Sequence, residues 1–264
     1  MKIIFNFVVI IFFLISLRLE SGIVNIDNSL SIEIIEKKGD ISNRFIFVAI
    51  HNNERDAIKT LRLAVENYGG KGFIFINRSR PGQRIIRVKK GRVSFLYDPN
   101  RIFSLEGIIE TLKYYNSHFY YIKNYAIKYL RKISVMIIKE LGIVQNSNSY
   151  IISLHNNIKT SDLSVKLFER SKYKVIIKKP LESKNFVLVN DKKLFERLSE
   201  LDINVVFFQG KYNDGSLGYF CTKNNYKYIN IETRFGEFEK QVEILKKVIN
   251  KIYEDMYDYY FYVI

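Results

Sequence analysis

Cysteine, proline and histidine are scarce in this chain of 264 residues, and tryptophan is absent: there are one cysteine, three prolines and three histidines. Because Cys221 is alone, no intrachain disulfide can form and no cysteine-based zinc site can be built. Cys221 is therefore expected to be a packed, inert thiol. No proline-rich linker, internal repeat or low-complexity stretch divides the chain. One large α/β domain is favoured over two small ones.

Acidic residues are also few, with 27 Asp and Glu against 42 Lys and Arg, which gives a formal net charge of +15. Such a charge attracts anionic partners, among them nucleic acids, membrane surfaces and cell-wall polymers. The basic residues are spread along the chain, and no dense basic run or aromatic-interleaved motif stands out. Nucleic-acid binding is therefore not expected.

The longest apolar run lies at the N-terminus, where residues 3–17 are interrupted only by Asn6 and Ser16. Its length suits the apolar region of a secretory signal better than a membrane span of ~20 residues. Residues 1–21 are predicted to be a signal peptide cleaved around Ser21, or else an uncleaved N-terminal membrane anchor. In both cases the domain over 22–264 is exported, either to the periplasm or anchored facing outside the cytoplasm.

Strand and helix patterns alternate after residue 21. Apolar runs predict a short leading strand within 22–40, strands at 44–50, 72–77, 149–154, 173–178, 185–189, 204–209 and 226–231, and a hairpin over 84–97 that turns at Lys90–Gly91. Helical spacing predicts helices over 54–68, 105–141, 192–201 and 236–257. The alternation predicts an α/β fold with a mixed, mostly parallel twisted sheet and helices on both faces.

Four polar clusters come directly after predicted strands. They are His51 with Glu54, residues 98–101, residues 155–157, and Glu232. Active sites of open α/β sheets lie beyond the carboxyl ends of the strands, so neighbouring strands would bring these clusters together. Each cluster alone also has a plain explanation, such as a structural histidine, a turn with proline at its second position or a surface ion pair.

The residue types in these clusters suit a catalytic zinc site. His51, Glu54 and His155 offer the imidazole and carboxylate ligands that such a zinc takes from a protein, with one position left for water. Glu232 is a candidate to accept the proton of that water and pass it to a leaving nitrogen. Arginine binds a substrate carboxylate through two parallel hydrogen bonds, a role open to Arg84 and Arg101.

The ordered series of motifs resembles the zinc carboxypeptidase superfamily, which includes the succinylglutamate desuccinylase and aspartoacylase branch. The stretches that carry the resemblance are HNNE, DPNR, SLHNN and YINIETRFG, and it spans roughly residues 44–240. The short interval between Glu54 and Asn100 fits compact bacterial members better than full-size digestive enzymes.

The resemblance implies a Zn²⁺ held by His51, Glu54 and His155, with Glu232 as general base and then general acid. It also implies an arginine that polarises the scissile carbonyl and an Asn–Arg pair that holds a substrate carboxylate. The matching positions are Arg84, with Arg87 as the alternative, for the first role, and Asn100 with Arg101 for the second. The mobile tyrosine of the family has no certain equivalent here, and Tyr219 and Tyr212 are the candidates.

Three remaining features receive plain interpretations. His118 is expected to pack or lie exposed on a helix, and residues 214–216 to form a turn. The aromatic run 253–264 is expected to pack against the body or to form a last edge strand.

The expected function is hydrolysis, by an exported zinc enzyme, of an amide bond in a peptide or muropeptide that carries a free carboxylate. A metal-free binding protein for an anionic or cell-wall ligand is the alternative, and a secreted structural protein with coincidental motifs is a third possibility. No nucleic-acid partner is expected, and the sequence does not indicate an oligomeric state.

Overall fold

Strands and helices alternate along the chain in the computed structural model, which describes residues 19–38, 44–146, 148–157 and 162–262. The strands are β1 (Glu20–Asn25), β2 (Leu30–Lys37), β3 (Phe45–Ala49), β4 (Gly70–Asn77), β5 (Ile86–Lys90), β6 (Val93–Tyr97), β7 (Tyr150–Asn157), β8 (Lys174–Ile176), β9 (Phe186–Val189), β10 (Val205–Phe207) and β11 (Tyr228–Arg234). The helices are α2 (Arg55–Tyr68), α3 (Leu105–Tyr115), α4 (Phe119–Leu141), α5 (Val165–Arg170), α6 (Lys192–Leu198), α7 (Leu217–Lys223) and α8 (Phe238–Tyr262), with 3₁₀ turns η2 (Pro99–Arg101) and η3 (Pro180–Glu182).

Nine strands form one mixed sheet in the order β1-β2-β4-β3-β7-β11-β9-β10-β8. Its centre is parallel, because β4, β3, β7 and β11 run in the same direction. Antiparallel pairings flank that centre, with β1, β2 and β4 on one side and β11 with β9 on the other. The predicted α/β fold with a mixed, mostly parallel sheet is confirmed, and the parallel strands form the core of the sheet.

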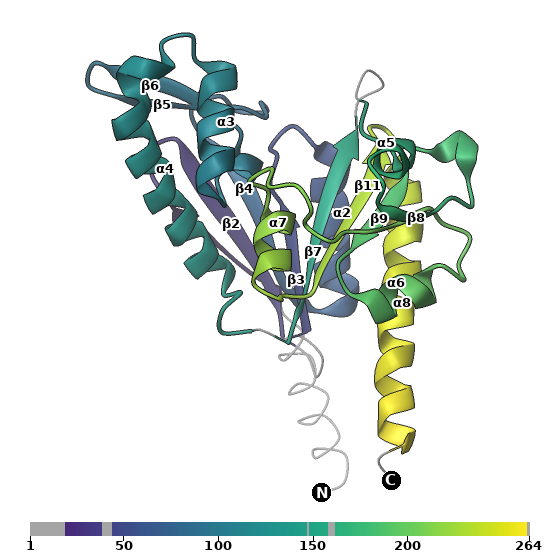
Figure 1. Cartoon of the computed structure of the whole chain (residues 1–264). Coiled ribbons are helices and arrows are strands. Elements are labelled where there is room, and N and C mark those ends of the chain that lie inside the picture. Colours follow the sequence, from purple (N-terminus) through teal and green to yellow (C-terminus); the bar gives the residue numbers. More distant parts are fainter. Residues whose placement is uncertain (1–18, 39–43, 147, 158–161, 263–264) are drawn as a thin grey trace, which may run out of the picture.

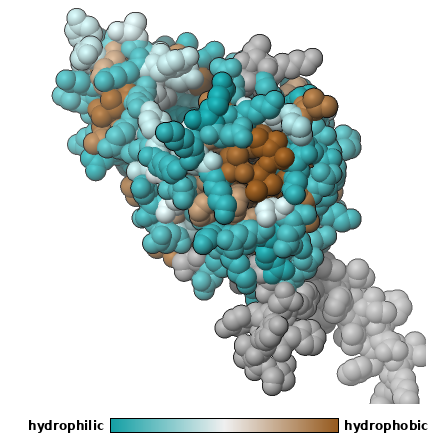
Figure 2. Space-filling view, turned by 45° about the vertical axis from the view of Figure 1, so that its right-hand side comes forward, coloured by the Kyte–Doolittle hydropathy of each residue, from teal (hydrophilic) through white to brown (hydrophobic). Residues whose placement is uncertain are grey.

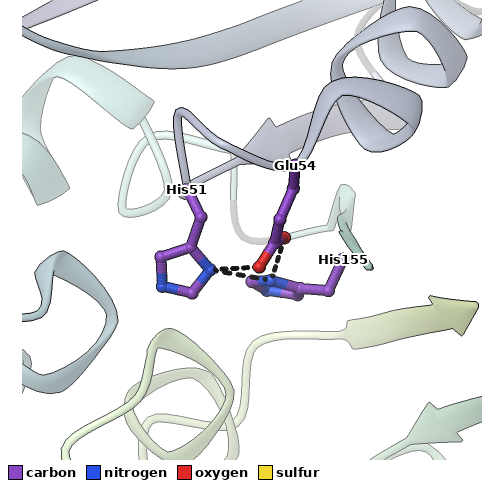
Figure 3. Close-up of side chains that lie close together, drawn as sticks. All are labelled: His51, Glu54 and His155. Atoms are coloured by element: carbon purple, nitrogen blue, oxygen red, sulfur yellow. Dashed lines mark hydrogen bonds and ion pairs between the residues drawn. The ribbon is translucent and has the colours of Figure 1, made fainter. Parts of the chain in front are cut away.

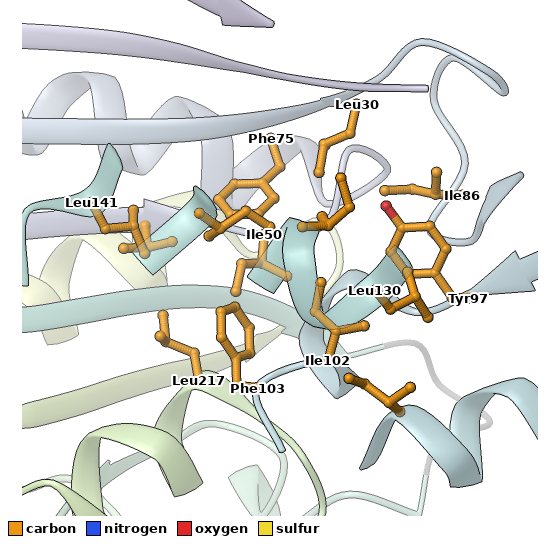
Figure 4. Close-up of a cluster of buried hydrophobic side chains, with 14 of the residues drawn as sticks. Leu30, Ile50, Phe75, Ile86, Tyr97, Ile102, Phe103, Leu130, Leu141 and Leu217 are labelled. Carbon is orange, nitrogen blue, oxygen red and sulfur yellow. The ribbon is translucent and has the colours of Figure 1, made fainter. Parts of the chain in front are cut away.

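Helices cover both faces of the sheet because side chains alternate along each strand. In β3, Phe45 and Phe47 enter a core under α2, α6 and α8, whereas Ile46 and Val48 enter a second core under α3, α4 and α7. We refer to these sides as the α2 face and the α4 face, and Figure 1 shows the helices arranged on them. Figure 4 shows part of the second core, where side chains from the sheet and from α4 and α7 meet.

The surface carries both hydrophilic and large hydrophobic side chains. Figure 2 shows one side of the molecule, where hydrophilic side chains surround a compact hydrophobic area. No helix in the described ranges is both long and apolar enough to cross a bilayer. The predicted signal or anchor falls on residues 1–21, of which 1–18 lie outside the described residues, and β1 begins at Glu20.

The leading segment forms two strands where the sequence predicted one. Between them, the carboxylate of Asp27 accepts hydrogen bonds from the backbone N–H groups of Ser29 and Leu30, both at 2.7 Å. An Asp that binds its own following backbone in this way fixes a tight turn. The turn allows β2 to pair with both β1 and β4.

The predicted helix over 105–141 is in fact two helices. Asn116 is extended (φ −134°, ψ 106°) and ends α3, and its side chain donates to the carbonyl groups of Leu112 and Leu96, both at 2.9 Å. These bonds replace the helical pattern at this point. His118 then precedes α4, and it is exposed as predicted, with Nε2 3.0 Å from the carbonyl oxygen of Ser94.

Other predicted elements differ at their ends. Helix α8 continues to Tyr262, so the final aromatic run is helical up to that residue and forms no edge strand. Figure 1 shows the last turns of α8 extending past the sheet. The short helices α5 and α7 were not predicted.

Candidate metal centre

The candidate metal centre lies on the α4 face, where β3 ends beside β7 and β11. His51 and Glu54 occupy the turn that leads from β3 into α2. His155 in β7 is the register partner of Glu232 in β11. Both point to the α4 face, because they share it with residues two and four positions earlier in their strands.

Two expectations about strand ends were wrong. β7 and β11 run on to Asn157 and Arg234, so His155 and Glu232 lie inside strands and not beyond them. Residues 98–101 do follow a strand, but β6 belongs to a separate two-stranded sheet with β5. This cluster therefore reaches the site from the hairpin that covers the α4 face.

The side chains of His51, Glu54 and His155 converge (Figure 3). The Nδ1 atoms of His51 and His155 are 3.3 Å apart. Oε1 of Glu54 lies 2.8 Å from Nδ1 of His51, and Oε2 lies 3.0 Å from Nδ1 of His155. All three residues are buried, with exposures of 1%, 2% and 4%.

The spacing of these atoms fits a tetrahedral zinc ion. Zn–N bonds of about 2.0–2.1 Å place two tetrahedral ligands roughly 3.3 Å apart, which matches the separation of the two Nδ1 atoms. One ligand atom from each residue can be chosen so that all lie within 4.8 Å of one another. The residues present can therefore hold the ion.

Hydrogen bonds on the far side of each imidazole aim Nδ1 at the centre. Nε2 of His51 donates to Oδ1 of Asp98 at 2.9 Å, since a carboxylate can only accept. A neutral His51 then turns the lone pair of Nδ1 toward the Glu54 carboxylate. That contact is favourable only with a cation between them, either a proton or a metal. Nε2 of His155 is likewise engaged, 3.1 Å from Oγ of Ser153.

Electrostatics agree with a site for positive charge. Burial raises the pKa of Glu54, but His51 and His155 outweigh it and hold this pKa well below its usual range. The pKa of Asp98 is also well below its usual range, because His51 and Arg84 outweigh burial. Burial and Arg84 lower the pKa of His51, but Glu54 and Asp98 raise it overall.

Arg84 joins the site through two carboxylates. Its Nε donates to Oδ2 of Asp98 at 2.9 Å, and one terminal nitrogen donates to Oε1 of Glu54 at 3.2 Å. Burial lowers the pKa of Arg84, but these carboxylates raise it overall, so the guanidinium stays charged. Arg87, the alternative for this position, is exposed on β5 and does not line the pocket.

Glu232 is a second buried carboxylate beside the three candidate ligands, with 5% exposure. Nδ2 of Asn230, on the same face of β11, donates to its Oε1 at 3.0 Å. Burial, with a further contribution from the charge of Glu54, raises the pKa of Glu232.

These groups line a pocket of about 140 Å³. The polar part of its lining includes the candidate ligands, Arg84, Asn100 and Arg101. The apolar part, which we call the apolar wall, consists of Leu163, Phe168, Phe186, Leu188, Phe208 and Tyr228. A ligand with both a polar and an apolar part fits such a pocket.

Asn100 and Arg101 line the pocket but are also engaged with the protein. Oδ1 of Asn100 accepts from the backbone N–H of Leu217 at 3.0 Å. One terminal nitrogen of Arg101 donates to Oδ2 of Asp214 at 2.5 Å. Residues 214–216 are therefore more than the turn predicted, because Asp214 borders the pocket and the Ser216 side chain caps α7.

Neither candidate tyrosine lines the pocket. Tyr219 is half-buried on α7, with its ring centroid 5.5 Å from Nζ of Lys223. Tyr212 is 62% exposed, and its hydroxyl donates to Glu110 at 3.3 Å. The tyrosine that does line the pocket is Tyr228.

Sequence reasoning gave no role to three residues that hydrogen-bond to the candidate ligands. They are Asp98, Ser153 and Gln241, whose Nε2 donates to the carbonyl oxygen of His155 at 2.8 Å. Asp98 carried a signal, since it is a carboxylate directly between a strand and the Asn–Arg pair. Gln241 is remote in sequence and looks like any polar residue on a helix.

Comparison with known proteins finds solved structures whose folds resemble this one, but no related sequence. No protein-family model matches the chain, and no curated protein matches it in sequence. Gene product Atu2144 from Agrobacterium tumefaciens is 13% identical, with a TM-score of 0.47 over 88% of this chain and 96% of the other. Murein-tripeptide amidase MpaA from Escherichia coli O157 is 11% identical, with a TM-score of 0.42 over 89% and 91%. A metallo-carboxypeptidase from Burkholderia cenocepacia is 9% identical, with a TM-score of 0.45 over 89% and 66%.

Proposed function

We propose that this protein is an exported, zinc-dependent amide hydrolase of the carboxypeptidase type, acting on a peptide or muropeptide that bears a free carboxylate. The observation that carries the proposal is the convergence of His51, Glu54 and His155 beside a second buried carboxylate, Glu232. A structural histidine needs one hydrogen-bond partner, whereas here two imidazoles turn the same nitrogen toward one carboxylate. The apolar N-terminal run supports export.

His51, Glu54 and His155 would hold the metal. When bound, zinc supplies a Lewis acid that makes a coordinated water more acidic and polarises a carbonyl group. Asp98 and Ser153 keep the two imidazoles in the orientation that this requires.

Glu232 is the group that would hold and move the proton. It faces the pocket from the strand next to His155, and Asn230 fixes one of its oxygen atoms. Burial raises the pKa of Glu232, which makes its carboxylate a stronger base toward the proton of a water molecule. Glu232 would thus take a proton from water and deliver it to the leaving nitrogen.

Arg84 would stabilise negative charge that develops on the carbonyl oxygen. The carboxylates of Asp98 and Glu54 anchor its Nε and one terminal nitrogen. Its other terminal nitrogen has no partner among the described residues. A fixed cation with a free donor at the edge of the pocket is the arrangement that such stabilisation needs.

The free carboxylate of the substrate would meet Asn100 and Arg101. Arg101 uses one terminal nitrogen for Asp214, which leaves the other donors of its planar group for a ligand. The apolar wall would contact an uncharged part of the substrate.

Bound metal and hydrolysis test the proposal together. We expect about one zinc per chain by elemental analysis, lost in the double variant His51→Ala, His155→Ala and retained in Glu232→Gln. Glu232→Gln should lower hydrolysis of peptides with a free C-terminal carboxylate by about 10²–10⁴-fold. Amidation of that carboxylate should also slow the wild-type enzyme.

The outcomes against the proposal are equally definite. A chain that stays free of zinc after reconstitution has no metal centre at these residues. A Glu232→Gln variant with full activity would remove the assigned base.

A further inference from the structure

A groove of about 400 Å³ lies between the β1–β2 turn, strand β5 and helix α4, and it shares no lining residue with the pocket at the metal centre. It is larger than that pocket. Its lining carries the cationic side chains Arg87, Lys89, Lys90 and Lys132. We refer to it as the basic groove.

The backbone explains why these side chains gather. In β5, Ile86 and Val88 are buried in the core on the α4 face, so Arg87 and Lys89 point outward. Lys132 comes from α4, together with Tyr129 and Met136 on the same side of the helix. Cations from a strand and from a helix line one groove.

These four cations have no acidic partner in the part of the chain that the structure describes. Asp27 is the one acidic residue in the lining, and its carboxylate accepts hydrogen bonds from Ser29, Leu30 and the hydroxyl of Tyr129. Elsewhere many surface cations are paired, as Arg62 is with Glu33 and Lys247 with Glu243. The groove therefore gathers four cations that have no acidic partner within the described ranges.

The sequence around β5 shows the same concentration. Seven of the fifteen residues over 78–92 are Lys or Arg, and none is acidic. The expectation that no dense basic run is present was therefore wrong for this segment. Close like charges repel one another, and a bound anion relieves that repulsion.

We propose that the basic groove binds a linear polyanion with repeated phosphate groups. Arg87 and Lys89 stand on the same side of β5, about 7 Å apart at the rise of a β-strand, which is longer than one phosphate. Arg and Lys both bind phosphate oxygens through charged hydrogen bonds. Lys90 and Lys132 also line the groove and would add further contacts.

The lining argues against single-stranded nucleic acid, which needs free aromatic faces for its bases. Tyr129 is the one aromatic residue in the lining. Its hydroxyl is bound to Asp27 and its ring stacks on Tyr125, with centroids 6.0 Å apart. Phosphate chains without bases have no such requirement.

Calorimetric titration of the full chain with long-chain inorganic polyphosphate tests the proposal. The triple variant Arg87→Ala, Lys89→Ala, Lys132→Ala should bind polyphosphate at least ~10-fold more weakly. The negative slope of log K against log salt concentration should become shallower by about two in this variant. A control of equal charge, Arg44→Ala, Lys178→Ala, Lys246→Ala, removes exposed cations outside the groove and should bind within about twofold of wild type. Thermal melts establish that both variants fold.

A second measurement needs no variant. Polyphosphate should protect Lys89, Lys90 and Lys132 from amine acylation, mapped by mass spectrometry, and should leave Lys178 and Lys246 reactive. Equal weakening in the control variant, absence of protection, or tighter binding of orthophosphate or of single-stranded RNA would each overturn the proposal. None of these results depends on zinc or on hydrolysis.

Discussion

Asp98 connects His51 and Arg84, two side chains of the candidate metal centre. Its Oδ1 accepts from His51 and its Oδ2 accepts from Arg84, both at 2.9 Å. Its own backbone N–H donates to Oγ1 of Thr111 at 2.9 Å, which ties it to α3. One buried carboxylate thus orients a candidate ligand and the neighbouring cation.

Loss of Asp98 should weaken metal binding without removing a ligand. We expect Asp98→Ala to lower zinc affinity about 10–100-fold, because nothing then fixes the tautomer of His51. Competition with a chelator of known affinity measures the effect. Asp214→Ala removes a pocket carboxylate that does not touch the ligands and is the control. Unchanged affinity in Asp98→Ala would contradict the positioning role.

Cys221 provides a test of burial at a single residue. The side chain is fully buried on α7, as predicted, and burial raises the pKa of its thiol well above the usual range. Since a thiol reacts as its thiolate, the folded protein should resist a thiol-specific disulfide reagent even at pH 9. The same reagent should modify one thiol per chain in denaturant. Rapid labelling of the folded protein would contradict the burial.

At the scale of elements, hydrophobic pattern predicted where strands lie but not where β7 and β11 end. Apolar runs locate the cores of these strands, because their side chains pack on both faces. In the sequence, His155 and Glu232 look like the first residues of loops, because a polar residue after an apolar run usually marks the end of a buried strand. Here they are buried together, and strand pairing continues through both of them. The sequence alone does not show which residues of two distant strands pair, so it could not place the ends of β7 and β11.

The contact between α3 and the loop before α7 depends on two glycines. A Cβ added to Gly107 would lie 2.3 Å from Cα of Gly215, and Gly215 itself has φ +69°. This contact holds the loop that carries Asp214 next to Arg101. Only glycine permits so close an approach of two backbones.

Gly107→Ala should therefore destabilise the fold even though alanine favours helices. We expect a loss of roughly 1–3 kcal/mol in the free energy of unfolding, since backbone atoms must move apart. Urea denaturation followed by circular dichroism measures it. Gly22→Ala is the matched control, because no atom lies within 4 Å of its added Cβ. Equal stability of the two variants would show that the loop yields without cost.

At the scale of the whole molecule, the sequence predicted one sheet with helices on both faces, and this is what forms. It did not predict how residues 98–101 reach the site. The sequence suggested four strands side by side, whereas β5 and β6 form a separate hairpin packed over the α4 face. Local pattern identifies a hairpin but does not show which sheet it joins.

Metal binding should stabilise the entire chain, because the candidate ligands come from segments about a hundred residues apart. Zinc at about 1,000 times its dissociation constant should add ~4 kcal/mol to the free energy of unfolding. Thermal melts with and without zinc should therefore separate in the wild type and coincide in His51→Ala, His155→Ala. An equal shift in both proteins would place the metal elsewhere.

The register pairing of His155 with Glu232 fixes the distance between the backbones of β7 and β11 at these two residues. Neighbouring strands are held about 4.8 Å apart by main-chain hydrogen bonds, so this separation does not depend on the identity of the surrounding side chains. The apolar wall and the loop that carries Asp214 come from other segments. Substitutions there could change which molecules enter the pocket, while the spacing of the strands that carry His155 and Glu232 stays constant.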